Sequence, residues 1–349
     1  MADFVKENYE WVENLTSKEW DDYLSALQGH PLQSAKWGDA RKLSCGIKDH
    51  RWLAFKEGSP YFIARFEQRR VFKFLKIAWV PKGPIIANKQ DEESLLNEFL
   101  HRLKKRGFFL CATNPWEKIE GTNLINSIFY TIWLDLAIGK EKLWMNLHKQ
   151  CRYDVKRSKK LGLVIEESES MDDLHSFYKI YELTSVTKGF NLSNSSPSMP
   201  HLFINRNNNK VKSHLFVARH EGNVCGGAFI IHCGENIHYI WGAVNRSYSH
   251  LCIGEALQWE IIEWGINHHC KKYDLEGISM SNSGVDKFKK KLGGTIISCP
   301  SVQIHPLNIV SKFILNSMSL YSFLKPKIGK CKNFISNKLC LWKNMEQKK

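Results

Sequence analysis

The chain has 349 residues, of which 43% are hydrophobic and 12% aromatic, and its formal net charge is +15. This length predicts about two domains of ordinary size, and the apolar content is enough for each to bury a core. The strong positive charge favours anionic partners such as RNA, a nucleotide diphosphate or an acidic membrane surface.

The sequence does not favour export or insertion into a membrane. The start, MADFVKENYEWVENL, carries acids where a signal peptide needs a basic and then an apolar run. No stretch approaches the ~18 uncharged apolar residues of a membrane-spanning helix. Ten scattered cysteines without a Cys-x-x-Cys pair fit a reducing cytosol better than disulfides or a zinc site. We expect a cytoplasmic protein with no bound metal, and peripheral contact with the inner face of the membrane stays open.

Two parts of the chain show the same order of predicted elements. The first has strands in YFIARFEQ (61–68) and VFKFLKIAWVPKGPII, then a helix in SLLNEFLHRLKKRG and a strand in FFLCATNP. The second has LFVARHEG (215–222), CGGAFIIHC and IHYIWGAV, then EALQWEIIEWGINHH and KKYDLEGI. Strand periodicity followed by helix periodicity in both parts predicts two similar α/β units. We match the Ala64-Arg65 strand of the first unit with the Ala218-Arg219 strand of the second.

A basic segment lies between the two units. Residues 140–160 hold eight Lys or Arg against two acids, Glu141 and Asp154, on a helical pattern that ends at Gly162. A solvated helix face rarely needs such an excess, so this segment is a candidate for contact with phosphate groups.

Each unit resembles the GNAT acyltransferase fold, in which a loop before a helix presents backbone amides to the pyrophosphate of acetyl-CoA. The matching segment here runs from Leu251 to Ala256 and retains Gly254 and Ala256. Leu251 replaces the usual polar residue, and Glu255 introduces an anion where a diphosphate would bind. Acetyl-CoA is therefore a poor candidate for the donor.

A resemblance of wider extent reaches to about residue 300. The segments HPLQSAKWGDARKLSCG, LDL with CRYDVKRSKKLGL, FVARHEGNVCGGAFI, YIWGA, LQWEIIEWG, KKYDLEGI and VDKFKKKLGG occur in the order found in the Fem family. Members of that family are tandem GNAT-like proteins that move an amino acid from aminoacyl-tRNA to an amine in the stem peptide of a muramyl peptide precursor. The resemblance implies the same activity here, with aminoacyl-tRNA and a muramyl pentapeptide precursor as partners and no cofactor.

The resemblance also implies roles for individual residues. Lys289 and Phe288 match the family's Phe-Lys motif, so Lys289 would face the tRNA end or the developing oxyanion while Phe288 packs beside the acyl group. Arg41 matches a basic residue that binds the precursor's diphosphate, and Lys36 lies close enough to share that role. We add four further candidates for substrate binding: Arg152, Arg157, Trp241 and Tyr248.

Two departures from the family bear on the substrates. Where some relatives end a strand in Asp-Pro, this chain has Asn114-Pro115, which cannot take a proton. The loop at 190–201 contains no arginine, although a relative has a diphosphate-binding arginine there. This weakens the case for a nucleotide-linked precursor and leaves room for a lipid-linked one or another acceptor.

We expect a first GNAT-like domain at 1–139, a second at 140–304 without the family's long coiled-coil arm, and a basic amphipathic tail at 305–349. The tail has nine Lys and one acid among aromatic and aliphatic residues, a pattern that fits anionic lipid, tRNA or solvent. We expect a monomer. The alternative functions are a GNAT-like N-acyltransferase that uses acyl-CoA or another donor on a different acceptor, and a noncatalytic RNA-binding or membrane-binding protein.

Overall fold

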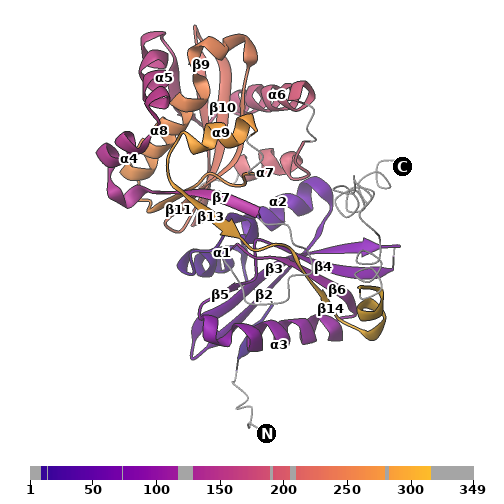
Figure 1. The fold of residues 1–349 in the computed structure, drawn as a ribbon. Coiled ribbons are helices and arrows are strands. Elements are labelled where there is room, and N and C mark those ends of the chain that lie inside the picture. Colours follow the sequence, from indigo (N-terminus) through magenta and orange to yellow (C-terminus); the bar gives the residue numbers. More distant parts are fainter. Residues whose placement is uncertain are drawn as a thin grey trace, which may run out of the picture.

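The computed structural model describes residues 9–13, 15–72, 74–116, 129–188, 192–204, 210–279 and 283–315. Within these residues the chain forms two seven-stranded mixed sheets with helices packed on them. Figure 1 shows the second unit above the first, with α1 and α2 lying between the two sheets. The expected fold class, two α/β units with mixed central sheets flanked by helices, is confirmed.

The first sheet has the order β1-β2-β3-β4-β6-β14, and β5 also pairs with β3. All neighbours are antiparallel except β4 and β6, which are parallel and are joined through the helix α3. Its strands are β1 (Glu10–Val12), β2 (Lys48–Lys56), β3 (Ser59–Val71), β4 (Leu75–Pro81), β5 (Ile85–Ile86), β6 (Phe108–Asn114) and β14 (Gln303–Pro306).

The second sheet has the order β13-β7-β12-β11-β10-β9-β8. Here β11 and β12 are the parallel pair, joined through α8. Its strands are β7 (Phe129–Asp135), β8 (Val164–Ser168), β9 (Val211–His220), β10 (Asn223–Cys233), β11 (Asn236–Val244), β12 (Lys272–Asp274) and β13 (Thr295–Cys299).

Several α-helices begin at residues whose side chains satisfy a free amide of the first turn. Ser34 caps α2 by accepting a hydrogen bond from the Trp37 amide, and Ser283 with Asp286 forms a capping box at α9. The α-helices are α1 (Ser17–Ala26), α2 (Ala35–Cys45), α3 (Glu92–Lys105), α4 (Lys140–Asn146), α5 (Lys149–Lys160), α6 (Met171–Lys188), α7 (Met199–Ile204), α8 (Ile253–Asn267) and α9 (Gly284–Lys290). Short 3₁₀ turns are η1 (Pro31–Gln33), η2 (Lys89–Asp91), η3 (Leu136–Ile138), η4 (Ser196–Ser198) and η5 (Arg246–Leu251).

The repeat is real, but its alignment is shifted by one strand. By its place in the sheet, β3, which contains Ala64 and Arg65, corresponds to β10, while Ala218 and Arg219 lie in β9. The strand that corresponds to β9 is β2, whose sequence KDHRWLAFK begins with charged residues and was not predicted as a strand. Its charged first residues are accommodated because Asp49 forms ion pairs with Arg51 and Arg65, whereas Trp52, Leu53 and Ala54 are buried.

The sheets do not divide where the sequence predicted domain boundaries at 139 and 304. β7 precedes the first boundary yet pairs with β12 and β13 of the second sheet. β14 spans the second boundary and pairs with β6 of the first sheet. The chain therefore passes between the units twice. The free edge of β6 is completed by the later strand β14, and that of β12 by the earlier strand β7.

A shared hydrophobic core joins the two units. It combines buried residues of α1 and α2, among them Trp20 and Trp37, with residues of α6, α7 and the second sheet, among them Phe177, Phe229 and Trp241. A further core lies within each unit. Since burial of a large apolar side chain stabilises by about 1.5–3 kcal/mol, this shared core holds the units in a defined relation.

The segment between 162 and 212 contains α6 and α7 and, in its described part, no antiparallel helical arm, as expected. Of the predicted tail, residues 305–315 are described, and 316–349 lie outside the described residues. None of the helices that the structure describes is long and apolar enough to cross a membrane.

Candidate active site at the junction of the two units

The parallel strands of the second sheet pair over a short distance only. β11 and β12 are in register from Asn236 with Lys272 to His238 with Asp274, and β11 then continues to Val244 without a partner on that side. The β10–β11 pairing has a bulge at Phe229, next to the point where the pairing of β11 with β12 ends. The residues that follow His238 and Asp274 therefore lie where two neighbouring strands separate.

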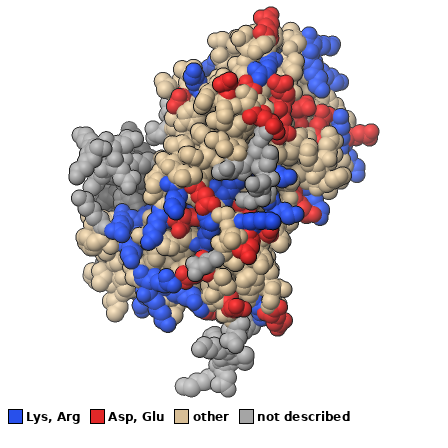
Figure 2. Space-filling view, turned by 180° about the vertical axis from the view of Figure 1, so that it is seen from behind, with Lys and Arg blue, Asp and Glu red and all other residues tan. Residues whose placement is uncertain are grey.

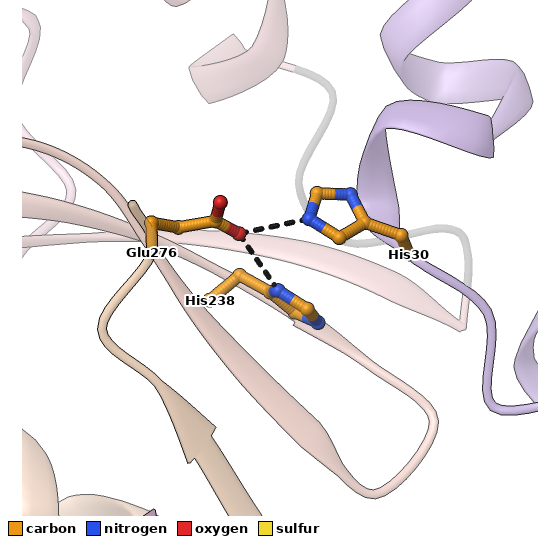
Figure 3. A group of neighbouring side chains, drawn as sticks. All are labelled: His30, His238 and Glu276. Atoms are coloured by element: carbon orange, nitrogen blue, oxygen red, sulfur yellow. Dashed lines mark hydrogen bonds and ion pairs between the residues drawn. The ribbon is translucent and has the colours of Figure 1, made fainter. Parts of the chain in front are cut away.

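Charged and titratable side chains from both units meet at this position. The carboxylate of Glu276, two residues after β12, lies 2.8 Å from His30 Nε2 and 3.1 Å from His238 Nδ1 through its Oε1 atom (Figure 3). Its Oε2 atom lies 3.7 Å from Lys82 Nζ. His30 and Lys82 belong to the first unit, so Glu276 is held from both sides of the junction.

The protonation of this group follows from its hydrogen bonds. His30 Nδ1 accepts a hydrogen bond from the backbone amide of Leu32 at 3.1 Å, so the ring proton is on Nε2 and is donated to Glu276. Burial lowers the pKa of His30 to about 3, even though Glu276 favours the charged form. For Glu276, burial acts to raise the pKa, but Lys82 and His30 outweigh it and hold that pKa well below the usual range. The group therefore consists of a carboxylate and a neutral His30 that donates to it.

His30, His238 and Glu276 also lie close enough together to be considered as metal ligands. A metal bound to His30 Nε2 would force the ring proton onto Nδ1, where it would face the amide hydrogen of Leu32. Lys82 beside Glu276 would add a repelling positive charge. The donor set therefore fits a hydrogen-bonded cluster better than a metal centre.

Lys289 reaches the same position from α9. Its Nζ donates to the backbone carbonyls of Glu276 at 3.1 Å and Gly277 at 2.9 Å, and it lies 5.8 Å from the centre of the Tyr239 ring. The residue is 7% exposed. Burial lowers the pKa of Lys289 to about 8, while Glu276 and Asp274 act in the opposite direction. An ammonium group of this kind is charged at neutral pH and close to losing its proton.

Asp274, the last residue of β12, is a structural acceptor. Its carboxylate accepts hydrogen bonds from the indole nitrogens of Trp116 at 3.1 Å and Trp133 at 3.0 Å, and from the hydroxyl of Thr131. The backbone amide of Glu276 donates to it as well, at 2.8 Å. Because Trp116 belongs to the first unit, Asp274 is a second link across the junction.

Phe288 packs on the first turn of α8. A side chain at Gly254 would meet the Phe288 ring at 3.1 Å, so the glycine in the loop segment resembling the acetyl-CoA loop makes room for this ring. Asp154 lies next to this turn, with its Oδ1 3.6 Å from Cys252 Sγ, and Glu255 is in the turn itself. Two carboxylates at a helix N-terminus oppose the binding of a pyrophosphate.

Trp241 packs on α2. It is buried, and its ring stacks on Trp37, with ring centres 5.7 Å apart. The stack joins α2 of the first unit to the part of β11 that has separated from β12. Trp241 therefore borders the junction, while Lys36, also buried, is the residue before Trp37 on α2.

Arg41 lies in a buried network of charges on the other side of α2. It donates to the carbonyl of Asn194 at 2.5 Å and lies 3.5 Å from Glu67, which also contacts Arg65 and Arg69. Burial acts to raise the pKa of Glu67, but the three arginines bring it to about 2. A diphosphate would have to compete with these contacts for the Arg41 guanidinium.

The remaining candidates lie apart from the junction cluster. Arg152 donates to the carbonyls of Met145 and Leu147 at the end of α4, and Arg157 is exposed on α5. Tyr248 is half-buried in η5 and contacts the His220 ring. The sequence-predicted residues are therefore distributed over the junction, the far side of α2 and the outer surface near α5.

Sequence reasoning gave no role to five residues of the junction, although each lies in a segment quoted for the family resemblance or for the repeat. They are His30, Lys82, His238, Asp274 and Glu276. The sequence signal that could have found Asp274 and Glu276 is the DLE sequence at the end of a buried strand, because carboxylates at strand ends often carry function.

Comparisons with known proteins agree with this architecture. A family model described as an acetyltransferase (GNAT) domain matches residues 146–290. The aminoacyltransferase FemA of Staphylococcus epidermidis is 31% identical over 114 residues, which are 30% of this chain and 27% of FemA. The chain thus matches about a quarter of the length of this curated relative.

Two solved structures share the fold over most of the chain. The crystal structure of FemX has a TM-score of 0.73 at 14% identity, covering 89% of this chain and all of FemX. The structure of L-PGS from Bacillus licheniformis has a TM-score of 0.55 at 15% identity, covering 86% of this chain and 96% of L-PGS. The expected resemblance is confirmed: the chain is similar in sequence to FemA over about 30% of its length and in fold to FemX, and residues 146–290 match a GNAT acetyltransferase domain.

Proposed function

We propose that the chain is an aminoacyltransferase that moves an amino acid from aminoacyl-tRNA to an amine in the stem peptide of a peptidoglycan precursor. The observation that carries this proposal is the buried Lys289 ammonium beside the separated ends of β11 and β12, at the position that the Fem resemblance implies. The likeness to FemA, which is named an aminoacyltransferase, supports the donor class.

The reaction is aminolysis of an ester. The acceptor nitrogen forms a bond to the aminoacyl carbonyl carbon, a tetrahedral oxyanion develops, and the ester bond to the ribose oxygen then breaks. Two hydrogens of Lys289 are donated to the carbonyls of Glu276 and Gly277, and the third is free to meet the oxyanion. In a buried site such a charge stabilises a developing anion more strongly than it would in water.

The proton lost by the attacking amine is taken up by the departing ribose oxygen. Asp274 and Glu276 are the nearby carboxylates, and both are engaged as acceptors in the links across the junction. We therefore assign them to positioning, and the proton passes within the substrates. This assignment agrees with Asn114, which leaves the first unit without a carboxylate at the corresponding strand end.

For substrate binding we assign Lys36, Arg41 and Trp241 to the precursor and Arg157 to tRNA. Trp241 borders the junction through β11, Lys36 lies before Trp37 on α2, and Arg157 is exposed on the basic helix α5. Arg152 supports this helix by binding the carbonyls of the preceding turn. We place the reaction in the cytoplasm, where aminoacyl-tRNA is available.

The direct test mixes the purified protein with a panel of radiolabelled aminoacyl-tRNAs and muramyl pentapeptide precursors, and then measures label in the peptide. We expect transfer from at least one aminoacyl-tRNA, and its loss after treatment with RNase. Transfer that survives RNase, or tight binding of acetyl-CoA measured by calorimetry, would favour the acyl-CoA alternative instead.

A further inference from the structure

The hairpin that joins β3 to β4 projects beyond the rest of the first sheet. On one side β2 begins at Lys48, opposite Gln68 of β3, and on the other side β6 begins at Phe108, opposite Lys76 of β4. Residues 69–75 therefore pair only with each other and with the start of β4, from Arg69 with Ile77 to Val71 with Leu75. We call residues 69–76 the β3–β4 finger; Lys73 in its turn lies outside the described residues.

The tip of the finger is apolar and exposed. Phe72 and Phe74 are each 73% exposed, and their rings lie 6.5 Å apart in a stacked arrangement. Val71 and Leu75 behind them are half-buried. Two phenylalanines at the end of a projecting hairpin gain little from the core of this chain, since no other described strand of the sheet pairs with this end of the hairpin.

The finger is also unfavourable in two local respects. Phe72 has a φ of 49°, a left-handed conformation that costs free energy for a bulky residue and is usually taken by Gly or Asn in such a turn. Arg70 lies directly opposite Lys76, and like charges in cross-strand pairs are destabilising. An anionic surface beside the tip would relieve the repulsion between Arg70 and Lys76, and the strained turn at Phe72 keeps the two rings at the end of the hairpin.

We propose that the β3–β4 finger is an anchor for an anionic lipid bilayer, in which Phe72 and Phe74 enter the interface and Arg70 and Lys76 meet lipid phosphates. Arg69 is instead held within the first unit by Glu67, at 2.9 Å, and by the Trp79 ring. The order of the residues along the finger matches the order of layers in a bilayer, since the apolar residues are at the tip and the cations behind it. Lys48, at the start of β2, adds an exposed cation at the base of the finger. Figure 2 shows Lys and Arg side chains gathered over the lower half of the molecule, which is the unit that carries the finger.

A bilayer fits the finger better than RNA does. The cations of the finger alone would suit either partner, but the two phenylalanines lie at the tip with the cations behind them, an order that matches the apolar and phosphate layers of a bilayer, whereas the paired stems of an RNA present phosphates outermost. The proposal is independent of the transferase activity, because it concerns a surface outside the junction.

The test is cosedimentation of the full chain with vesicles of phosphatidylglycerol and phosphatidylcholine, over a range of salt concentrations. The test variant is Phe72→Asn/Phe74→Gln, in which Asn suits the left-handed turn and should keep the fold intact. The matched control is Leu183→Gln/Val186→Gln, which removes two exposed apolar residues of α6 that are 64% and 78% exposed. Thermal unfolding of each variant checks the fold.

We expect the wild-type chain and the control variant to bind anionic vesicles with similar affinity, and the finger variant to bind at least tenfold more weakly. Arg70→Gln should reduce the dependence of binding on salt. Residues 316–349 are present in every protein, so their contribution is common to all. Wild-type affinity in the finger variant, absence of vesicle binding in the wild type, or a loss of affinity for tRNA instead of vesicles would each overturn the proposal.

Discussion

The two parallel strand pairs of the molecule end differently. In the first sheet β4 and β6 pair from Lys76 with Phe108, through a register shift after Lys76, to Pro81 with Asn114, which is the end of both strands. In the second sheet β11 and β12 pair over three residues, and β11 then continues for six more, paired with β10 but with no described strand on its other side. Because β4 and β6 are paired to their last residues, no gap separates their carboxyl ends. Where β11 and β12 separate, backbone carbonyls and side chains face the first unit.

The two units, although similar in fold, therefore contribute different residues to the junction. The second unit supplies Lys289 and the carboxylates that follow β12, and the first supplies His30, Lys82 and Trp116 to hold them. Under the proposed function, the second unit carries the chemistry and the first unit positions it. The predictions below address this division, beginning with the largest expected effect.

Replacement of Lys289 by methionine removes the cation from the second unit. We expect turnover to fall by about 10² to 10³, as when one oxyanion donor is lost, with little change in precursor affinity. Burial lowers the pKa of Lys289 to about 8, so the protonated group lowers the stability of the folded wild type at neutral pH. This loss of stability is relieved as pH rises from about 8 toward the ordinary lysine pKa. The methionine variant should therefore not melt earlier than the wild type. Near-normal turnover would return Lys289 to a structural role.

Replacement of Glu276 by glutamine tests the link between the units. Glu276 favours the charged form of Lys289, so its loss should lower the Lys289 pKa and move the alkaline fall in activity to lower pH by about one unit. The matched control is Glu167→Gln, which breaks another His–Glu pair, with His214 at 2.7 Å, away from Lys289. An unchanged pH profile in the Glu276 variant, or an equal shift in the control, would contradict the link.

A test with a smaller expected effect compares Asp274, at the end of β12, with Asn114, at the end of β6. Asp274→Asn should lower the free energy of unfolding by about 1–3 kcal/mol, because two indole N–H groups and a hydroxyl lose the carboxylate that accepts their hydrogen bonds. Asn114→Asp, which gives the first unit a carboxylate at the same place, should change stability by less than about 0.5 kcal/mol and leave turnover unaltered. Denaturant unfolding and the transfer assay measure both. A gain in turnover in the Asn114→Asp variant would mean that the first unit also takes part in the chemistry.

The sequence was sufficient for the fold class, because that depends on local signals, and the same kind of signal singles out Lys289, whose role remains a prediction. Alternation in the strands, periodicity in α3 and α8 and the Phe288-Lys289 pair can each be read within a short window. The junction cluster could not be predicted in this way. His30 and Glu276 are 246 residues apart in the chain, and only the packing of one unit on the other brings them within hydrogen-bond distance.

The strands that complete each sheet beside its parallel pair also could not be assigned from the sequence. β14 and β7 lie on the far side of the predicted boundaries because their partners are set by which sheet edge is open, a tertiary property. The guanidinium of Arg41 illustrates the same limit: its place after Trp37 suggests phosphate binding, while the fold surrounds it with Glu67 and the carbonyl of Asn194.

The pH dependence of turnover, compared between the wild type and Lys289→Arg, tests the central claim most directly. If the Lys289 ammonium at the junction stabilises the oxyanion, the wild-type rate should fall as pH rises through about 8, the pKa that burial gives this group. The arginine variant should retain part of the activity and lose this fall, because guanidinium stays protonated throughout the range. The same alkaline fall in both proteins would show that another group titrates, and the assignment of the chemistry to Lys289 would be wrong.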